Sequence, residues 1–144
     1  MSFQDLSFRE KSAWAMGALV LAITIFYLID VQPISWRTGE APPVDRHFIK
    51  ITIATIVGSI LIQGLLAARN PKEADAPADE RERLALARAG SLSGFILGFG
   101  SIAALMNYLV HPNGDLLFHG ILLSLLVSTI AESALQIFFF RRGG

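Results

Sequence analysis

A glutamate, Glu132, stands in the middle of the apolar C-terminal stretch "VSTIAESALQIFFFRR". Ser128, Glu132 and Gln136 follow one another at intervals of four residues, so a helix places them along one face. Ser59 and Gln63 have the same spacing in an earlier apolar stretch, "ITIATIVGSILIQGLL". A carboxyl group in such surroundings either shares hydrogen bonds with polar neighbours or takes part in a function through its proton. The sequence leaves both alternatives open.

The polar residues of the two stretches lie at related depths. Gln63 lies six residues before Arg69, and Gln136 lies five residues before Arg141. At about 1.5 Å per residue, both amides are roughly 8–9 Å inside the basic ends of their helices. If the two stretches face each other, the amides and the serine hydroxyls surround the carboxyl group of Glu132. No lysine or arginine lies at that depth, so we expect this carboxyl group to be protonated.

The histidines form no diagnostic metal motif. His47, His111 and His119 fall near the ends of apolar stretches, on the side away from the basic ends. Histidine and carboxylate could bind a divalent ion, but this spacing does not predict a metal site or a haem. No cysteine is present, and no histidine is placed beside a serine and a carboxylate within the apolar stretches, as a hydrolase requires. We expect no cofactor and no enzymatic activity.

The composition is that of a membrane protein. Of the residues, 53% are hydrophobic and 17% are charged, whereas an ordinary soluble domain has about 25% charged residues. A helix needs about 20 mostly apolar residues to cross a bilayer core of about 30 Å. Four stretches qualify, over about 12–31, 48–68, 89–110 and 116–140. Lipid-exposed backbone must satisfy its own hydrogen bonds, so we predict an all-α fold, a single membrane domain (1–144) with an antiparallel bundle of four transmembrane helices.

The basic residues orient the predicted bundle. Of the 12 lysines and arginines, nine lie on one side. They are Arg9, Lys11, Arg69, Lys72, Arg81, Arg83, Arg88, Arg141 and Arg142. Arg37, Arg46 and Lys50 lie on the other side. The positive-inside rule then places both termini and the 69–88 connection in the cytoplasm. The formal net charge of zero argues against direct binding of nucleic acid.

The two longer connections give different signals. Residues 32–47 contain three prolines and Gly39, so we predict a non-helical outer loop with Trp36 at the level of the lipid headgroups. In the 69–88 connection, the first half is small, charged and proline-containing, hence flexible. Asp79 then has Glu82 three residues later, which is a capping-box pattern. We predict a helix that begins at Glu80 and continues into the third span.

The start of this helix is strongly charged. Asp79, Glu80, Arg81, Arg83 and Arg88 gather in the last ten residues before the third span. They form either an ordinary solvated helix start with interfacial arginines or a docking site for a cytoplasmic protein partner.

The third span carries a strip of small residues. Gly90, Gly94 and Gly98 repeat every four residues, and Ser101 continues the strip. Small residues at this spacing let two membrane helices approach closely. The partner is either another helix of the same bundle or a second copy in a homodimer.

The segment "DERERLALARA" also resembles a known pattern. It is similar to the D-E-R-x-R-x-[IL]-x-x-[KR]-[AG] segment of a family of small, uncharacterised prokaryotic four-helix membrane proteins that end in a short basic tail, as Arg141 and Arg142 do here. Ala85 departs from the pattern at its aliphatic position. The resemblance implies a bacterial or archaeal cytoplasmic membrane and no known reaction. Members often occur beside small helix-turn-helix regulators, which suggests a regulatory partnership at the membrane.

Two functions fit these observations. The first is a non-enzymatic accessory or regulatory membrane protein that meets a cytoplasmic partner through the helix start at Glu80. The second is a small proton-coupled transporter or channel in which Glu132 titrates. Small multidrug-resistance transporters also combine four helices with one membrane glutamate, but theirs lies in the first span.

Overall fold

The computed structural model describes residues 6–38, 40–69 and 71–142, without the side chains of 32–38 and 44–47. Within these ranges all regular structure is helical. The helices are α1 (Phe8–Thr38), α2 (Val44–Arg69), α3 (Pro71–Ala74), α4 (Glu80–Val110) and α5 (Gly114–Arg142). All but α3 are long and apolar enough to cross a membrane. The predicted all-α fold with four membrane-spanning helices is therefore confirmed, and each predicted span lies inside one long helix.

The predicted start of α4 is also confirmed. Asp79 is the N-cap, and its Oδ1 accepts a hydrogen bond of 2.7 Å from the backbone N–H of Glu82. The Glu82 side chain in turn accepts from the Asp79 N–H at 3.4 Å. This reciprocal pair satisfies two donors that every helix start leaves open. Because α4 has 31 residues, it reaches well beyond a bilayer core and projects its charged first turns past the membrane.

The connections are more helical than predicted. The expected outer loop over 32–47 is wrong for most of its length, because α1 continues to Thr38 and α2 begins at Val44. Pro33 lies inside α1, two residues past the apolar segment Phe8–Val31 that is able to cross a membrane. The short α3 begins at Pro71, the first helical position, where the missing N–H of proline costs nothing. The side chain of Trp36 lies outside the described residues.

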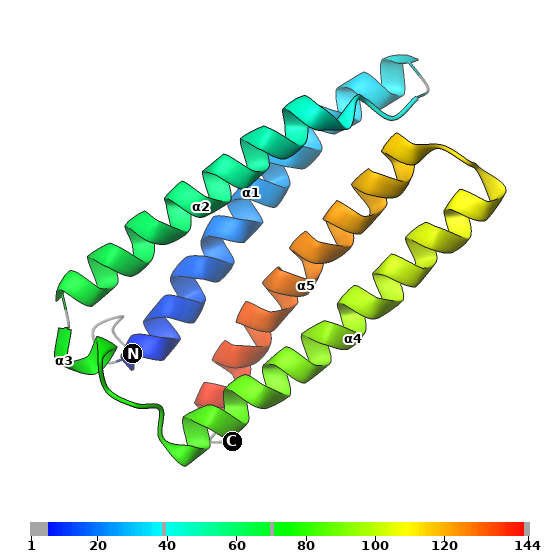
Figure 1. Ribbon diagram of the computed structural model, residues 1–144. Helices are drawn as coiled ribbons and strands as arrows, with labels where there is room; N and C mark the ends of the chain where they lie inside the picture. The colour runs from blue at the N-terminus through cyan, green and yellow to red at the C-terminus, as the bar shows by residue number, and fades with distance from the viewer. Residues whose placement is uncertain (1–5, 39, 70, 143–144) are drawn as a thin grey trace.

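The long helices form a row rather than a closed bundle. In the order α2, α1, α5, α4 they lie side by side, each antiparallel to its neighbour (Figure 1). Contact is most extensive between α4 and α5, followed by α1 with α5 and α1 with α2, while α2 barely touches α5. The start of α1 and the end of α5 lie at the same end of the row, beside α3 and the start of α4 (Figure 1). We call this the terminal end and the opposite one the far end.

The apolar core lies where α1, α2 and α5 meet, toward the far end. Its buried members are Val20, Ile23, Tyr27, Ile51, Leu122 and Leu126. The outer helices α2 and α4 expose many large apolar side chains, among them Phe95 and Phe99, which are 74% and 78% exposed. Lipid tails are as apolar as these side chains, so the hydrophobic effect does not drive a row of membrane helices to close.

Glycines let neighbouring helices approach closely at two seams. A Cβ atom placed on Gly100 of α4 would lie 2.8 Å from the Cβ of Ser124 on α5. One turn along, a Cβ on Gly120 of α5 would lie 3.0 Å from the Cβ of Ala104 on α4. Between α1 and α5, a Cβ on Gly17 would lie 2.9 Å from the Cβ of Ser133. A larger residue at any of these glycines has to push two helices apart.

Candidate partner-binding site at the terminal end

Polar side chains from the first turns of α1 tie it to the other three long helices. Each of these contacts joins α1 to a different helix. They are Arg9 Nε to Glu82 Oε2 of α4 at 3.0 Å, Glu10 Oε1 to Arg141 Nε of α5 at 3.0 Å, and Ser12 Oγ to Gln63 Nε2 of α2 at 2.7 Å. The start of α1 is therefore the point at which the terminal end is held together.

Arg9 also holds the connection before α4. Its Nη2 donates to the backbone oxygen of Ala76 at 3.0 Å, while its Nε pairs with Glu82. Glu82 thus has two partners, because it both completes the capping box of α4 and accepts from Arg9. An exposed ion pair contributes at most about 1 kcal/mol. The main effect of this contact is that Arg9 positions the segment between α3 and α4.

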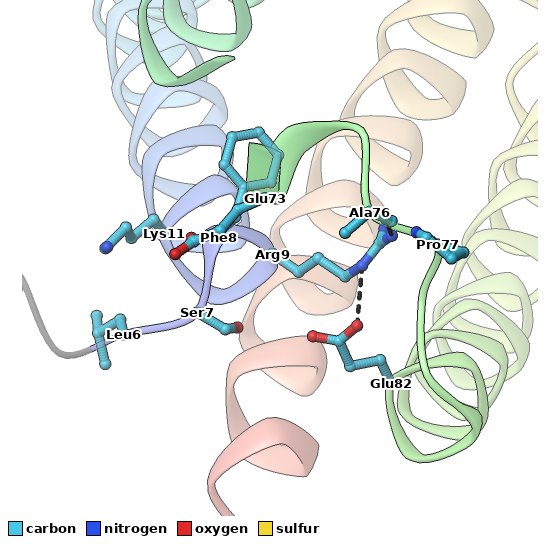
Figure 2. Close-up of a pocket in the computed structure, with 9 residues that line it drawn as sticks. All are labelled: Leu6, Ser7, Phe8, Arg9, Lys11, Glu73, Ala76, Pro77 and Glu82. Carbon is cyan, nitrogen blue, oxygen red and sulfur yellow. Dashed lines mark hydrogen bonds and ion pairs between the residues drawn. The ribbon is translucent and has the colours of Figure 1, made fainter. Parts of the chain in front are cut away.

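A water-accessible cavity of about 440 Å³ lies beside Arg9. Figure 2 shows Arg9 extending across it from α1 toward Glu82, with Ala76 and Pro77 on the connecting segment. The cavity is lined by charged and small apolar residues from α1, α3, the following connection and α4. They are Leu6, Ser7, Phe8, Arg9, Lys11, Glu73, Ala76, Pro77 and Glu82. A cavity of this size and mixed polarity can receive a few side chains of another protein.

A second, smaller cavity of about 210 Å³ adjoins the start of α4. Its walls include Glu10 of α1, Arg81 of α4, and Phe139 and Phe140 near the end of α5. Three long helices therefore meet at this point, and Arg81 stands at their junction.

The predicted docking residues divide into two roles. Asp79 is the N-cap of α4, so its carboxylate is committed to the backbone of its own helix. Glu80, Arg81, Arg83 and Arg88 are exposed. The three arginines form no ion pair with a residue that the structure describes. They are available to a partner.

The structure does not bring the predicted membrane polar residues into one cluster. Because α1 lies between α2 and α5, Ser59 and Gln63 are kept away from Glu132. Gln63 bonds to Ser12 of α1, and the Ser59 hydroxyl donates to the backbone oxygen of Ile56 in its own helix at 2.9 Å.

The other half of the predicted cluster stays together on α5. Gln136 Nε2 donates to Glu132 Oε1 at 3.2 Å, one turn apart on the same helix. The Ser128 hydroxyl is buried and donates across the seam to the backbone oxygen of Ser93 on α4 at 2.9 Å. Glu132 is half-buried, and no described cation pairs with it.

Gly94 and Gly98, the middle of the glycine strip on α4, do not face another described helix of the same chain. Gly94 and Gly98 are exposed, and no heavy atom lies within 4 Å of a Cβ placed on either. A Cβ on Gly90 would lie 4.0 Å from Glu132 Oε1, and Ser101 is half-buried. Of the two predicted partners, a helix of the same bundle is seen at Gly90, which lies beside Glu132 of α5, but not at Gly94 and Gly98. A second copy stays a prediction.

A buried hydrogen-bonded trio closes the far end. The Tyr27 hydroxyl of α1 lies 2.5 Å from Nδ1 of His119 on α5, and His119 Nε2 lies 2.9 Å from the backbone oxygen of Pro42. A carbonyl only accepts, so Nε2 carries the hydrogen and Nδ1 of a neutral ring accepts from Tyr27. The trio anchors the connection between α1 and α2. His111 is exposed at the end of α4, and the side chain of His47 lies outside the described residues.

Replacing Tyr27 with phenylalanine should lower the free energy of unfolding by about 1–3 kcal/mol, because a buried ring nitrogen of His119 loses its donor. Thermal melts of the purified protein followed by circular dichroism measure this change. The matched control is Tyr108→Phe, since Tyr108 is 38% exposed near the end of α4. Equal melting temperatures for the two variants would show that the trio contributes nothing.

Sequence reasoning missed the role of the α1 start. The Ser7 hydroxyl accepts from the backbone N–H of Glu10 at 3.2 Å, as an N-cap does. The segment "SFRE" carries the capping-box signature, so this helix start could have been found. The contacts of Arg9 with Glu82 and of Glu10 with Arg141 join residues far apart in the chain, and no local pattern predicts them.

Comparison of the chain with protein-family models, with curated proteins and with solved structures finds no match. The geometry of the site therefore carries the functional argument.

Proposed function

We propose that the chain is a non-enzymatic accessory or regulatory protein of a prokaryotic cytoplasmic membrane that binds a cytoplasmic protein through the terminal end. The observation that carries this proposal is the first three turns of α4, where Arg81, Arg83 and Arg88 are exposed and form no ion pair with a residue that the structure describes. The same helix start contributes Glu82 to the cavity beside Arg9, whose walls come from four separate segments. The partner surface then presents acidic side chains.

The construction of the terminal end supports this proposal. Its arginines divide between those that form ion pairs and those that form none with a residue that the structure describes. Arg9 and Arg141 are paired with Glu82 and Glu10, whereas Arg81 and Arg83 project from a capped, rigid helix start. Preformed charges on a rigid element bind with little loss of conformational entropy, and they raise the association rate.

Site-specific photocrosslinking in native membranes tests the proposal. A photoreactive amino acid at Ala76, an exposed wall residue of the larger cavity, should give a defined protein adduct. The double charge reversal Arg81→Glu and Arg83→Glu should reduce that adduct at least about tenfold, because acidic groups of the partner would then be repelled.

Two controls accompany this experiment. Arg69→Glu is a matched charge reversal at an exposed residue of α2 and should leave the adduct unchanged. A photoreactive residue at Glu40, in the far-end connection, should give a different set of adducts. Adducts with lipid alone, or a protein adduct that charge reversal leaves intact, would refute the proposed docking site.

A further inference from the structure

We infer that a second copy of this chain covers the surface on which Glu132 lies. This surface, the Glu132 face, consists of Glu132 and Gln136 of α5 with Gly90, Gly94 and Gly98 of α4. The inference is independent of the proposed cytoplasmic partner, because it concerns a different surface at membrane depth.

The carboxyl group of Glu132 carries the inference. It lies nine residues before Arg141, roughly 13 Å inside the basic end of α5. Its described partner is Gln136, from the same helix and one turn away, and that hydrogen bond uses a single oxygen atom, Oε1. A carboxyl group facing lipid at this depth is costly, so a hydrogen-bonding surface has to meet it.

Helix geometry places the open glycines on the same face. Ser93 marks the side of α4 that faces α5, because its backbone oxygen accepts from Ser128. Successive residues of an α-helix are rotated by about 100° about its axis. Relative to Ser93, Gly94 is therefore rotated by about 100° in one direction, and Ile96 by about 300°, which equals about 60° in the other direction. The two residues thus lie on opposite faces of the row. Gly90 is turned the same way as Gly94, and Glu132 Oε1 reaches to within 4.0 Å of a Cβ placed on Gly90. Ile96 instead lines an apolar groove on the other face, with Phe99 and Val127.

The polar groups of the Glu132 face complement a copy of themselves. A protonated Glu132 retains an O–H donor, and Gln136 retains its amide oxygen as an acceptor. Across a twofold axis, Glu132 of each copy can donate to Gln136 of the other, as an isologous interface requires. Gly94 and Gly98 leave the backbone of α4 open to close approach. Both copies have the same charge distribution, so they insert in the same orientation.

Disulfide crosslinking tests this interface directly. The chain contains no cysteine, so with a single introduced cysteine a disulfide within this protein has to join two copies. Gly94→Cys, oxidised in native membranes, should give a product of twice the chain mass of 15.7 kDa. Ile96→Cys is the matched control two residues away and should stay monomeric, because a disulfide requires Cα atoms within about 7 Å. A monomeric Gly94→Cys, equal crosslinking of both variants or a product of a different mass would overturn the inference.

The role of the carboxyl group is tested in the Gly94→Cys background. Glu132→Gln should preserve the crosslinked product, because an amide keeps a donor and an acceptor. Glu132→Leu should reduce it about eightfold, since two symmetric interhelical hydrogen bonds are lost. Gln136→Leu should reduce it similarly and serves as an independent check if Glu132→Leu fails to fold. Crosslinking that neither leucine variant alters would overturn the assignment of Glu132 to the interface.

Discussion

Replacing Gly100 with leucine is expected to separate α4 from α5 and to cost about 3 kcal/mol or more of folding free energy. Gly100 lies where α4 and α5 are closest, and a Cβ there would already lie 2.8 Å from the Cβ of Ser124. Ser124 cannot turn away easily, because its Cβ is fixed to the α5 backbone. The contact between α4 and α5 is the most extensive in the chain, so its loss should unfold both helices from the row. Thermal melts and elution on a detergent column measure the effect.

A leucine at Gly64 provides the control for this variant. Gly64 lies in α2, is exposed, and has no heavy atom within 4 Å of a Cβ placed on it. Gly64→Leu should leave the melting temperature unchanged or raise it slightly, since leucine has the higher helix propensity. If Gly64→Leu were as damaging as Gly100→Leu, a general effect of bulk on membrane insertion would explain both.

A double variant at Gly100 and Ser124 tests whether these two residues limit the approach of α4 to α5. Gly100→Ala alone forces a shift at Ser124, whereas Gly100→Ala combined with Ser124→Gly adds a methyl group on α4 and removes from α5 the side chain that it would meet. The hydrogen bond from the Ser124 hydroxyl to the Gly120 oxygen is lost in the single and in the double Ser124 variant alike. The double variant should be more stable than the sum of the two single changes predicts, by at least about 0.5 kcal/mol. Strict additivity would show that the two residues do not limit the approach of the helices.

The features predicted from the sequence are those that depend on local chemistry. The length and composition of four apolar stretches determine that they form membrane helices, because lipid leaves the backbone no alternative. The start of α4 followed from Asp79 and Glu82, a pair whose hydrogen bonds close within one turn. Pro33 misled the prediction, because a proline raises the cost of a helix without excluding it and α1 continues past this residue. Pro42 and Pro43 do lie in the non-helical connection before α2.

The order of the helices in space could not be predicted from the sequence. Ser59 and Gln63 match the spacing and depth of Ser128 and Gln136, and this match suggested that α2 faces α5. The structure inserts α1 between them, and Gln63 finds Ser12 instead. Any polar side chain at the depth of Gln63 can form a hydrogen bond with it. The depth of a residue therefore does not identify the helix that lies beside it.

The glycine pattern failed as a guide to intramolecular packing for a related reason. The regular repeat is open at Gly94 and Gly98, whereas the closest approach of α4 to α5 uses Gly100 with Ala104. These lie on different sides of α4, which a list of spacings cannot separate without knowing where α5 sits. Small residues that contact no other helix of their own chain are available for contact with a second copy, as we propose for the Glu132 face.

Of the substitutions at Glu132, lysine is expected to damage the protein most. An ammonium group is strongly hydrated, and placing one in the membrane costs about 2.5–3.5 kcal/mol even when the side chain can reach toward the interface. Glu132→Leu should cost less, about 1–3 kcal/mol, because it leaves Gln136 without its acceptor. Glu132→Gln should be nearly silent, since it keeps the shape of the side chain and a donor. Thermal melts of the three variants at acidic and neutral pH rank them.

The same series separates the two roles that the sequence left open for Glu132. If the carboxyl group serves only as a hydrogen-bonding group, Glu132→Gln should preserve the fold, the crosslinked dimer and every activity of the protein, because an amide replaces a protonated carboxyl group closely. If Glu132 exchanges protons in a transport cycle, the same variant should keep the fold and lose a pH-dependent flux in reconstituted vesicles, because an amide has no proton to release in this range. A third outcome, in which Glu132→Gln melts as early as Glu132→Lys at neutral pH, would mean that the carboxyl group is ionised. None of the described ion pairs would then supply its counter-charge, because no described lysine or arginine pairs with Glu132, and the hydrogen-bonding scheme for the Glu132 face would be wrong.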